Sequence, residues 1–211
     1  MAARKTFFNK LAETWDENYV NSRLLTFLED FVPKFGLEPG QRVLDLGAGT
    51  GILIPFLLKA VGASGHVTAV DFADKMVEIC ESKYAGFPNV SFECQEIEEL
   101  NLPSESFDAV VCFGVFPHIE DKEQALLQIN RVLKTGGRLI IAHALSSQEI
   151  QEHHHKTSSV VADDQLPTKE EMEKLLTGNG FLRSSIIDKP GEYLNLSIKT
   201  PPKFQGKATN K

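Results

Sequence analysis

The chain has few cysteines, a deficit of positive charge and no long apolar run. Its 211 residues contain only 3 cysteines, and Cys80, Cys94 and Cys112 form no CxxC pair. This pattern excludes a disulfide framework and a thiolate zinc site, and it is typical of a reduced, cytoplasmic protein. No apolar run is long enough to cross a bilayer. Acidic residues from position 13 onward come too early for a secretory signal, so we expect a cytoplasmic protein without a membrane span.

The charge balance argues against one class of partner. The sequence has 22 lysines and arginines against 29 acidic residues, which gives a net charge of −7. Such a surface repels phosphate backbones, so we expect no nucleic-acid partner.

Apolar segments alternate between strand-like and helix-like patterns, which predicts an α/β fold with a mainly parallel sheet. We expect strands over residues 42–46, 66–70, 90–94, 107–113 and 138–143. We expect a helix through Met76 and Cys80, and further helices over residues 5–14, 21–31, 51–61, 121–134 and 168–178. Residues 181–187 and 192–199 flank a Lys-Pro-Gly turn and predict a closing antiparallel hairpin.

These elements predict a single domain over residues 1–199. It begins with an N-terminal helical cap (1–36), whose helices offer a surface for a homodimer, and continues with a core (37–143). Residues 144–167 are polar and histidine-rich, have no clear period, and are expected over the site. A helix and hairpin (168–199) close the domain, and residues 200–211 read as a disordered tail.

A glycine-rich loop lies between the first strand and the helix after it. Asp45 is followed by Gly47, Gly49 and Gly51, and glycines let such a loop bend tightly while its backbone approaches a ligand. The following helix offers free N–H groups to an anionic part of that ligand. A dinucleotide fold requires glycine where Ile52 stands, which disfavours a dinucleotide oxidoreductase.

An acidic residue follows the loop at a suitable distance. Asp71 ends the second strand roughly 20 residues further on, where a carboxylate can bind both hydroxyls of a ribose. Phe72 comes next and can pack against a purine. Loop and carboxylate together predict a nucleoside-containing ligand rather than an ordinary turn.

At this point the sequence resembles the class I S-adenosylmethionine-dependent methyltransferases, in particular the ubiquinone/menaquinone-biosynthesis type. The likeness rests on VLDLGAGTG (43–51), TAVDFADKMVE (68–78), FECQEIEELNLPSESFDAVVCFGVFPHI (92–119) and INRVLKTGGRLIIAHA (129–144). The opening segment FFNKLAETWDENY (7–19) is similar as well. The resemblance implies a three-layer αβα Rossmann-like fold whose seven-stranded, mostly parallel sheet has the order 3-2-1-4-5-7-6. It also implies S-adenosylmethionine as cofactor and methyl transfer to a small-molecule acceptor.

The resemblance further implies roles for single residues at the cofactor. The methionine and ribose portion would be lined by Asp45, Gly47, Gly49 and Gly51. Asp71 would hold the ribose hydroxyls, and Phe72 would flank the adenine.

Two later motifs complete the implied cofactor site. Glu96 and Ile97 match the position that reads the adenine edge, although the family usually has Gly-Asp where Gln95-Glu96 stands. Phe113, at the end of the fourth strand, would present its carbonyl to the ligand's ammonium group. An Asn-Pro-Pro-Tyr-like motif at residues 113–116 would indicate methylation of a planar amide or base nitrogen. The sequence there is Phe-Gly-Val-Phe, which argues against that subgroup of methyltransferases.

Histidines are the candidate catalytic residues, because methylation of a phenol, enol or thiol is helped by a base near neutral pH. His118 follows the fourth strand and His143 ends the fifth, at the carboxyl ends where such folds bind ligands. The alternatives are a packing residue for His118 and a hydrogen-bonded core histidine for His143. Trp15 and Tyr19, one helical turn apart, either close over the site or pin the N-terminal helix to the sheet.

Three adjacent histidines occupy the segment after the fifth strand. In an extended segment His153 and His155 share a face and His154 points away. Three interpretations stay open: a metal site completed by His118, His143, Asp163 or Asp164, a substrate contact or base at His154, or a solvated loop. There is no HExxH, and we assign no metal ligand.

A small-molecule methyltransferase is therefore the preferred function. The alternatives are a metal-assisted transferase that uses residues 153–155 and a non-catalytic protein that binds S-adenosylmethionine. Fold alone does not decide between them.

Overall fold

The computed structural model describes residues 2–201, apart from the side chains of residues 183 and 184. The predicted tail lies outside the described residues from position 202 onward. At its start, however, Thr200 is fixed, since its N–H and its hydroxyl both donate to the carbonyl of Gly180 at 2.9 Å. The disorder of the tail stays a prediction.

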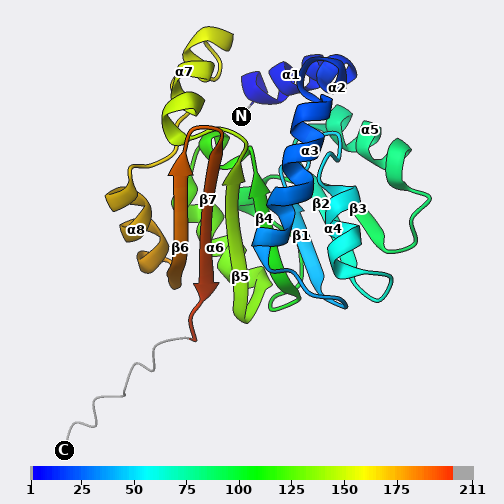
Figure 1. The fold of residues 1–211 in the computed structure, drawn as a ribbon, viewed down its shortest axis with the longest axis vertical. Coiled ribbons are helices and arrows are strands. Elements are labelled where there is room, and N and C mark those ends of the chain that lie inside the picture. Colours follow the sequence, from blue (N-terminus) through cyan, green and yellow to red (C-terminus); the bar gives the residue numbers. More distant parts are fainter. Residues whose placement is uncertain (1, 202–211) are drawn as a thin grey trace, which may run out of the picture.

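Seven strands form one sheet in the order β3-β2-β1-β4-β5-β7-β6 (Figure 1). The first five pair in parallel, and β7 pairs antiparallel with both β5 and β6. Their bounds are β1 Arg42–Leu46, β2 His66–Asp71, β3 Val90–Cys94, β4 Phe107–Phe113, β5 Leu133–His143, β6 Phe181–Lys189 and β7 Glu192–Lys199. The predicted strand order and closing hairpin are confirmed.

Eight α-helices and several short 3-10 turns connect the described strands. The helices are α1 Ala2–Leu11, α2 Trp15–Tyr19, α3 Ser22–Phe31, α4 Ile54–Val61, α5 Asp74–Tyr84, α6 Lys122–Val132, α7 Ser147–Thr157 and α8 Lys169–Gly178. None of the described helices has the length and apolar character that crossing a membrane requires.

Helices cover both faces of the sheet, so its central strands read as continuous apolar runs. Alternate residues of β4 enter different cores: Val110 and Cys112 face the core under α6 and α8, and Ala109 and Val111 face the core under α3 and α4. These four side chains are fully buried. The three layers hold the carboxyl ends of the parallel strands rigidly at one edge.

Residues 144–167 correct one prediction. They contain α7, where no period was expected, and its first turn is closed by a capping box in which Ser146 and Glu149 bond each other's backbone N–H. The Ser-x-x-Glu spacing is the sequence signal of such a helix start. Because the segment is helical, the assumption that residues 153 and 155 share one face is wrong.

Several element ends also differ from the predictions. The helix expected over residues 5–14 is α1 followed by a 3-10 turn over residues 12–14, and α2 begins beyond it. Helix α4 begins at Ile54, with Pro55 in its first turn, rather than at residue 51. Helix α6 ends at Val132, because Leu133 already pairs with Phe107 before the strand bulges and resumes pairing at residue 138.

Candidate active site

The candidate site lies at the edge where β1, β2, β4 and β5 end. Figure 1 shows α1, α2 and α7 at this end of the sheet. Parallel α/β sheets bind ligands at this edge, in the crevice where the strand order reverses. Here that crevice lies between β1 and β4.

The glycine loop is packed tightly at its ends and open in its middle. Gly47, Gly49 and Gly51 have φ of 70°, 54° and 89°, in the left-handed region that favours glycine. A Cβ at residue 47 would collide with Val115, and one at residue 51 would lie 2.6 Å from the Tyr84 ring. A Cβ at residue 49 would meet nothing within 4 Å. A ligand can therefore approach the backbone at Gly49.

Asp71 joins the second strand to this loop. Its side chain is 7% exposed, and its two oxygens accept the N–H of Gly49 and of Ala73, both at 2.9 Å. Burial raises the pKa of Asp71, and these N–H donors act in the opposite direction. A carboxylate can accept about four hydrogen bonds, so Asp71 keeps capacity for ligand hydroxyls.

Asp45 is buried, and one of its carboxylate oxygens lacks a hydrogen-bond partner among the described residues. It is 1% exposed, and its Oδ2 has no hydrogen-bond partner among the described residues. Burial, together with the nearby charge of Asp71, raises the pKa of Asp45 to about 7. An unpaired buried oxygen is costly, so Asp45 indicates a polar partner that the chain itself does not supply.

The other predicted cofactor residues surround the same crevice. The ring of Phe72 contacts that of Phe8 in α1 at a centroid distance of 5.6 Å. Glu96 is partly buried, which raises its pKa, and Ile97 is buried. The N–H of the preceding Gln95 donates to the carbonyl of Asp71 at 3.1 Å, so this segment begins beside the end of β2.

His143 and Phe113 lie side by side at the ends of β5 and β4. Their rings stack at 6.3 Å with an interplanar angle of 29°. The Nδ1 atom of His143 is buried and has no hydrogen-bond partner among the described residues. Burial, and then the neighbouring histidines, lower the pKa of His143 to about 3, so its ring is neutral near pH 7.

The side chain of His118 is held by a buried aspartate, Asp164. Its Nδ1 lies 2.6 Å from Oδ2 of Asp164, which is 6% exposed. Two guanidinium nitrogens of Arg4, in α1, donate to the same carboxylate at 2.5 Å each. Burial opposes ionisation, but the hydrogen bonds from Arg4 and His118 prevail and lower the pKa of Asp164 to about 2.

The three histidines of α7 differ in their exposure to solvent. Only His154 is buried, and its Nδ1 lies 2.6 Å from the backbone carbonyl of Asp164. Its ring stands 4.7 Å from that of His118. His153 and His155 are exposed. Among the described residues no group of three histidine, cysteine or acidic side chains is placed to hold a metal ion, so the structure lends no support to the metal-assisted alternative.

The cap is fastened over the glycine loop by polar contacts. Asp16 of α2 accepts a hydrogen bond from the Thr50 hydroxyl at 2.5 Å and pairs with Lys83. The rings of Trp15 and Tyr19 lie 4.4 Å apart, and Trp15 packs with Ala73 and Met76 around β2 and α5. These contacts close the cap over the glycine loop.

Comparisons with known proteins agree with this geometry. A model of the methyltransferase domain family matches residues 37–189, most of the chain. The chain belongs to the methyltransferase domain family.

Individual members of the family are also similar to this chain. The ubiquinone/menaquinone biosynthesis C-methyltransferase UbiE of Psychromonas ingrahamii is 32% identical over 179 residues, which cover 81% of this chain and 69% of that enzyme. The UbiE of Vibrio campbellii is 38% identical over 109 residues, 50% of this chain and 42% of that enzyme. A SAM-dependent methyltransferase structure from Aquifex aeolicus shares the fold, with a TM-score of 0.75, 23% identity and coverage of 91% and 98%.

The prediction of a class I S-adenosylmethionine-dependent methyltransferase with a Rossmann-like fold is thereby confirmed. The predicted division into cap, core, insert and closing hairpin, the homodimer and the role of each site residue stay predictions. Reasoning from the sequence missed Arg4 and Asp16 in the cap, and it considered Asp164 only as a helper of a metal site and not as a partner of His118. No local pattern marks them, because each acts through a partner far away in the sequence.

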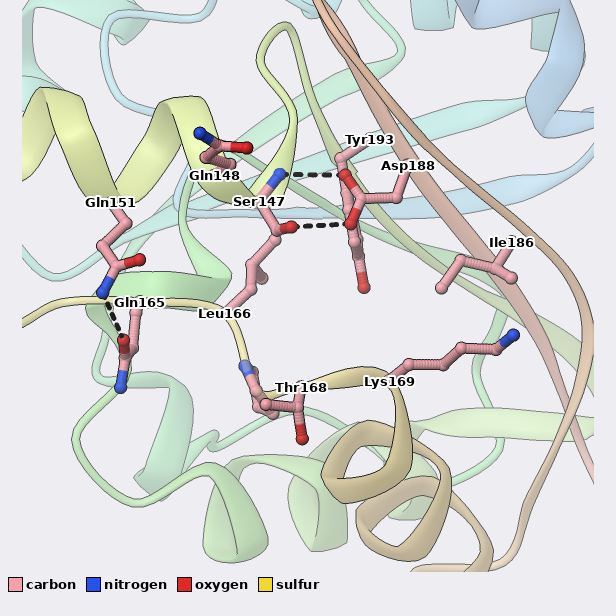
Figure 2. Close-up of a pocket in the computed structure, with 11 residues that line it drawn as sticks. Ser147, Gln148, Gln151, Gln165, Leu166, Thr168, Lys169, Ile186, Asp188 and Tyr193 are labelled. Atoms are coloured by element: carbon pink, nitrogen blue, oxygen red, sulfur yellow. Dashed lines mark hydrogen bonds between the residues drawn. The ribbon is translucent and has the colours of Figure 1, made fainter.

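A hollow of about 260 Å³ lies elsewhere in the described part of the molecule. It is enclosed by the start of α7, residues 165–169 and the β6–β7 hairpin, and its wall includes Ser147 bonded to Asp188 and Gln151 bonded to Gln165 (Figure 2). None of the predicted site residues lines it.

Proposed function

We propose that this protein transfers the methyl group of S-adenosylmethionine to a small-molecule acceptor by direct in-line attack. The observation that carries the proposal is the pair of buried carboxylates at the glycine loop. Asp45 lacks a partner for one oxygen, Asp71 has spare capacity, and the backbone beside them is open only at Gly49. A polar, nucleoside-containing ligand is the partner that this arrangement accommodates.

Each surrounding residue has a part in holding the cofactor. Asp71 would accept the ribose hydroxyls, and Phe72 would flank the adenine whose edge meets Glu96 and Ile97. The carbonyl of Phe113 would face the ammonium group of the methionine portion. These contacts are all at the carboxyl ends of β1 to β4, in agreement with the family fold.

The chemistry places modest demands on the chain. When bound, the sulfonium supplies an electrophilic methyl group, so the chain must align the nucleophile and exclude water. Alignment alone lowers such barriers by roughly 7–11 kcal/mol in favourable cases. The cap would exclude water from the site, because the Asp16–Thr50 and Phe8–Phe72 contacts close it over the glycine loop.

The acceptor class follows from the relatives and the histidines. The similar enzymes are named as C-methyltransferases of quinone biosynthesis, and carbon attack on a methyl group is promoted when an adjacent hydroxyl loses its proton. His118 and His143 stand at the acceptor end of the crevice, each with a pKa that burial lowers. We therefore propose a phenol or enol as the acceptor, with a histidine as base.

One experiment tests this function without assuming the acceptor. The protein is incubated with methyl-labelled S-adenosylmethionine and a cell metabolite extract, and labelled products are identified. We expect a labelled small molecule whose formation requires the protein and stops in Asp71→Ala. Tight cofactor binding by calorimetry with no labelled product, in extracts and in a panel of hydroquinones and phenols, would favour a non-catalytic binding protein.

A further inference from the structure

Asp164 connects three parts of the molecule that are distant in sequence. Its Oδ2 meets both Arg4 of α1, at 2.5 Å, and Nδ1 of His118, at 2.6 Å, and its Oδ1 meets the second guanidinium nitrogen of Arg4. Its backbone carbonyl accepts from Nδ1 of His154 in α7. The cap and α7 thus meet at one residue: the cap contacts the carboxylate of Asp164, α7 contacts its backbone carbonyl, and the carboxylate also contacts His118 of the site.

The chemistry of this contact decides where the proton of His118 lies. A carboxylate paired with a guanidinium is ionised and can only accept hydrogen bonds. The Nδ1 of His118 must therefore be the protonated nitrogen, and the lone pair of the neutral ring lies on Nε2. A histidine fixed in this tautomer by a carboxylate is oriented to accept a proton.

The ring of His118 also borders the proposed cofactor site. Phe8 contacts His118 at 5.4 Å and Phe72 at 5.6 Å, so one aromatic side chain of the cap touches both. The side chain of His118 is 17% exposed and ends the short 3-10 turn Phe116–His118 that comes after β4. It is therefore accessible without being freely solvated.

His143 is the weaker candidate for the same task. Burial lowers the pKa of His118 as well as that of His143, so His143 differs in its hydrogen-bond partners instead. Its Nδ1 has no partner among the described residues, so nothing there selects its tautomer. Of the two histidines that follow strands, only His118 has an orienting carboxylate.

We infer that Asp164 is a positioning residue that fixes His118 as the general base for the acceptor hydroxyl, and that Arg4 engages this carboxylate from the closed cap. The inference rests on the proposed function. The hydroxyl proton passes to Nε2 of His118 while the acceptor atom bonds to the methyl carbon. The S–CH₃ bond breaks, its electron pair stays on sulfur as a neutral thioether, and the imidazolium later releases its proton to water.

The first test reads the tautomer directly and needs no acceptor. In ¹⁵N-labelled full-length protein with S-adenosylhomocysteine added, we expect the neutral His118 ring to show the Nδ1–H tautomer above pH 7. In Asp164→Asn we expect a substantial Nε2–H population, and in Asp164→Glu a return toward the original signal. An Nε2–H tautomer in the unaltered protein would overturn the inference even if methyl transfer is found.

The second test separates positioning from binding. With methyl-labelled S-adenosylmethionine and the labelled acceptor fraction of the extract, we expect Asp164→Asn to lower kcat roughly 100-fold, within the range of a lost general base. KM for the cofactor should change less than about 3-fold, and Asp164→Glu should recover part of the rate. Asp163→Asn, which alters the exposed neighbouring residue, is the matched control and should behave as the unaltered protein.

The outcomes distinguish the two proposals. No methyl transfer by the unaltered protein contradicts the proposed function, whereas the tautomer measurement still stands. Normal turnover by folded Asp164→Asn contradicts the inference and leaves the function intact. If Asp164→Asn does not fold, Asp164→Glu and the tautomer of the unaltered protein decide.

Discussion

Asp71 and Asp164 are buried to nearly the same extent, 7% and 6% exposed, and yet their ionisation is shifted in opposite directions. The hydrogen bonds of Asp71 come from backbone N–H groups, and burial outweighs them and raises its pKa. Asp164 is bonded to a guanidinium and an imidazole, and its pKa falls to about 2. The exposed fraction alone therefore does not decide the charge of a buried carboxylate, because desolvation raises its pKa while guanidinium and imidazole partners lower it.

The contrast also separates the site into two halves with different tasks. The glycine-loop half, made of Asp45, residues 47–51 and Asp71, has polar atoms with spare capacity and is ready for a ligand. The histidine half, made of Arg4, His118, His154 and Asp164, has its charged groups paired with one another. We expect changes in the glycine-loop half to alter cofactor affinity, and changes in the histidine half to alter turnover, as in the Asp164 experiment above.

The largest effect is expected for Asp71→Ala. Hydrogen bonds to a charged group contribute about 1.5–3 kcal/mol each, so losing the carboxylate should weaken cofactor binding about 100-fold by calorimetry. Asp108→Ala is the matched control, because Asp108 accepts the N–H of Arg42 at 2.8 Å and pairs with Lys134 near the opposite, amino-terminal end of its strand. Equal affinity in both variants, with both folded by circular dichroism, would remove the distinction between the halves.

The next effect is a gain in stability for Asp45→Asn. The pKa of Asp45 in the folded protein is about 7, above the unfolded value of 3.8. Its contribution to stability is therefore complete below pH 3.8 and is lost as the pH rises through 7. In urea unfolding at pH 8 we expect the variant to be more stable than the unaltered protein, with a smaller difference at pH 5. A difference that does not depend on pH would contradict the assigned cause.

The same variant should bind the cofactor more weakly at pH 8. An asparagine offers one carbonyl oxygen and no charge where the unpaired carboxylate now faces the crevice. Greater stability with lower affinity would show that Asp45 is kept for the ligand rather than for the fold. Unchanged affinity would place Asp45 outside the glycine-loop half.

The smallest effect is expected for Gly49→Ala. The φ of 54° costs an alanine about 1 kcal/mol of stability, and its Cβ would project into the open space where the ligand approaches. Gly136→Ala is matched, since Gly136 has a φ of 79° and equal room, but lies in the bulge of β5 away from the site. Thermal unfolding should shift alike in the two variants, and cofactor affinity should fall, about 10-fold, in Gly49→Ala alone.

The glycine-loop half could be predicted from the sequence, because its geometry is local. Three glycines with positive φ within five residues, and an aspartate at the end of the next strand, dictate a turn and a carboxylate at one strand edge. The strand order followed from the family resemblance, and the sheet confirms it.

The histidine half could not be predicted, because its partners are not local. Arg4 and Asp164 are 160 positions apart, and His118 and Asp164 are 46 apart, so no periodicity connects them. Helix α7 escaped detection because its buried residues are only Ile150 and His154. That pair has the i, i+4 spacing of a helix, but one member is polar and does not register as part of an apolar face.

The position of β7 has a consequence for synthesis of the chain. This strand lies between β5 and β6, and each of the two pairs with β7 along its length. While a ribosome makes the polypeptide from its amino end, the edge of β5 stays unpaired and β6 has no neighbour until residues 192–199 emerge. The sheet is thus completed only when β7 has left the exit tunnel. Until then the unpaired edge of β5 can pair with other nascent chains.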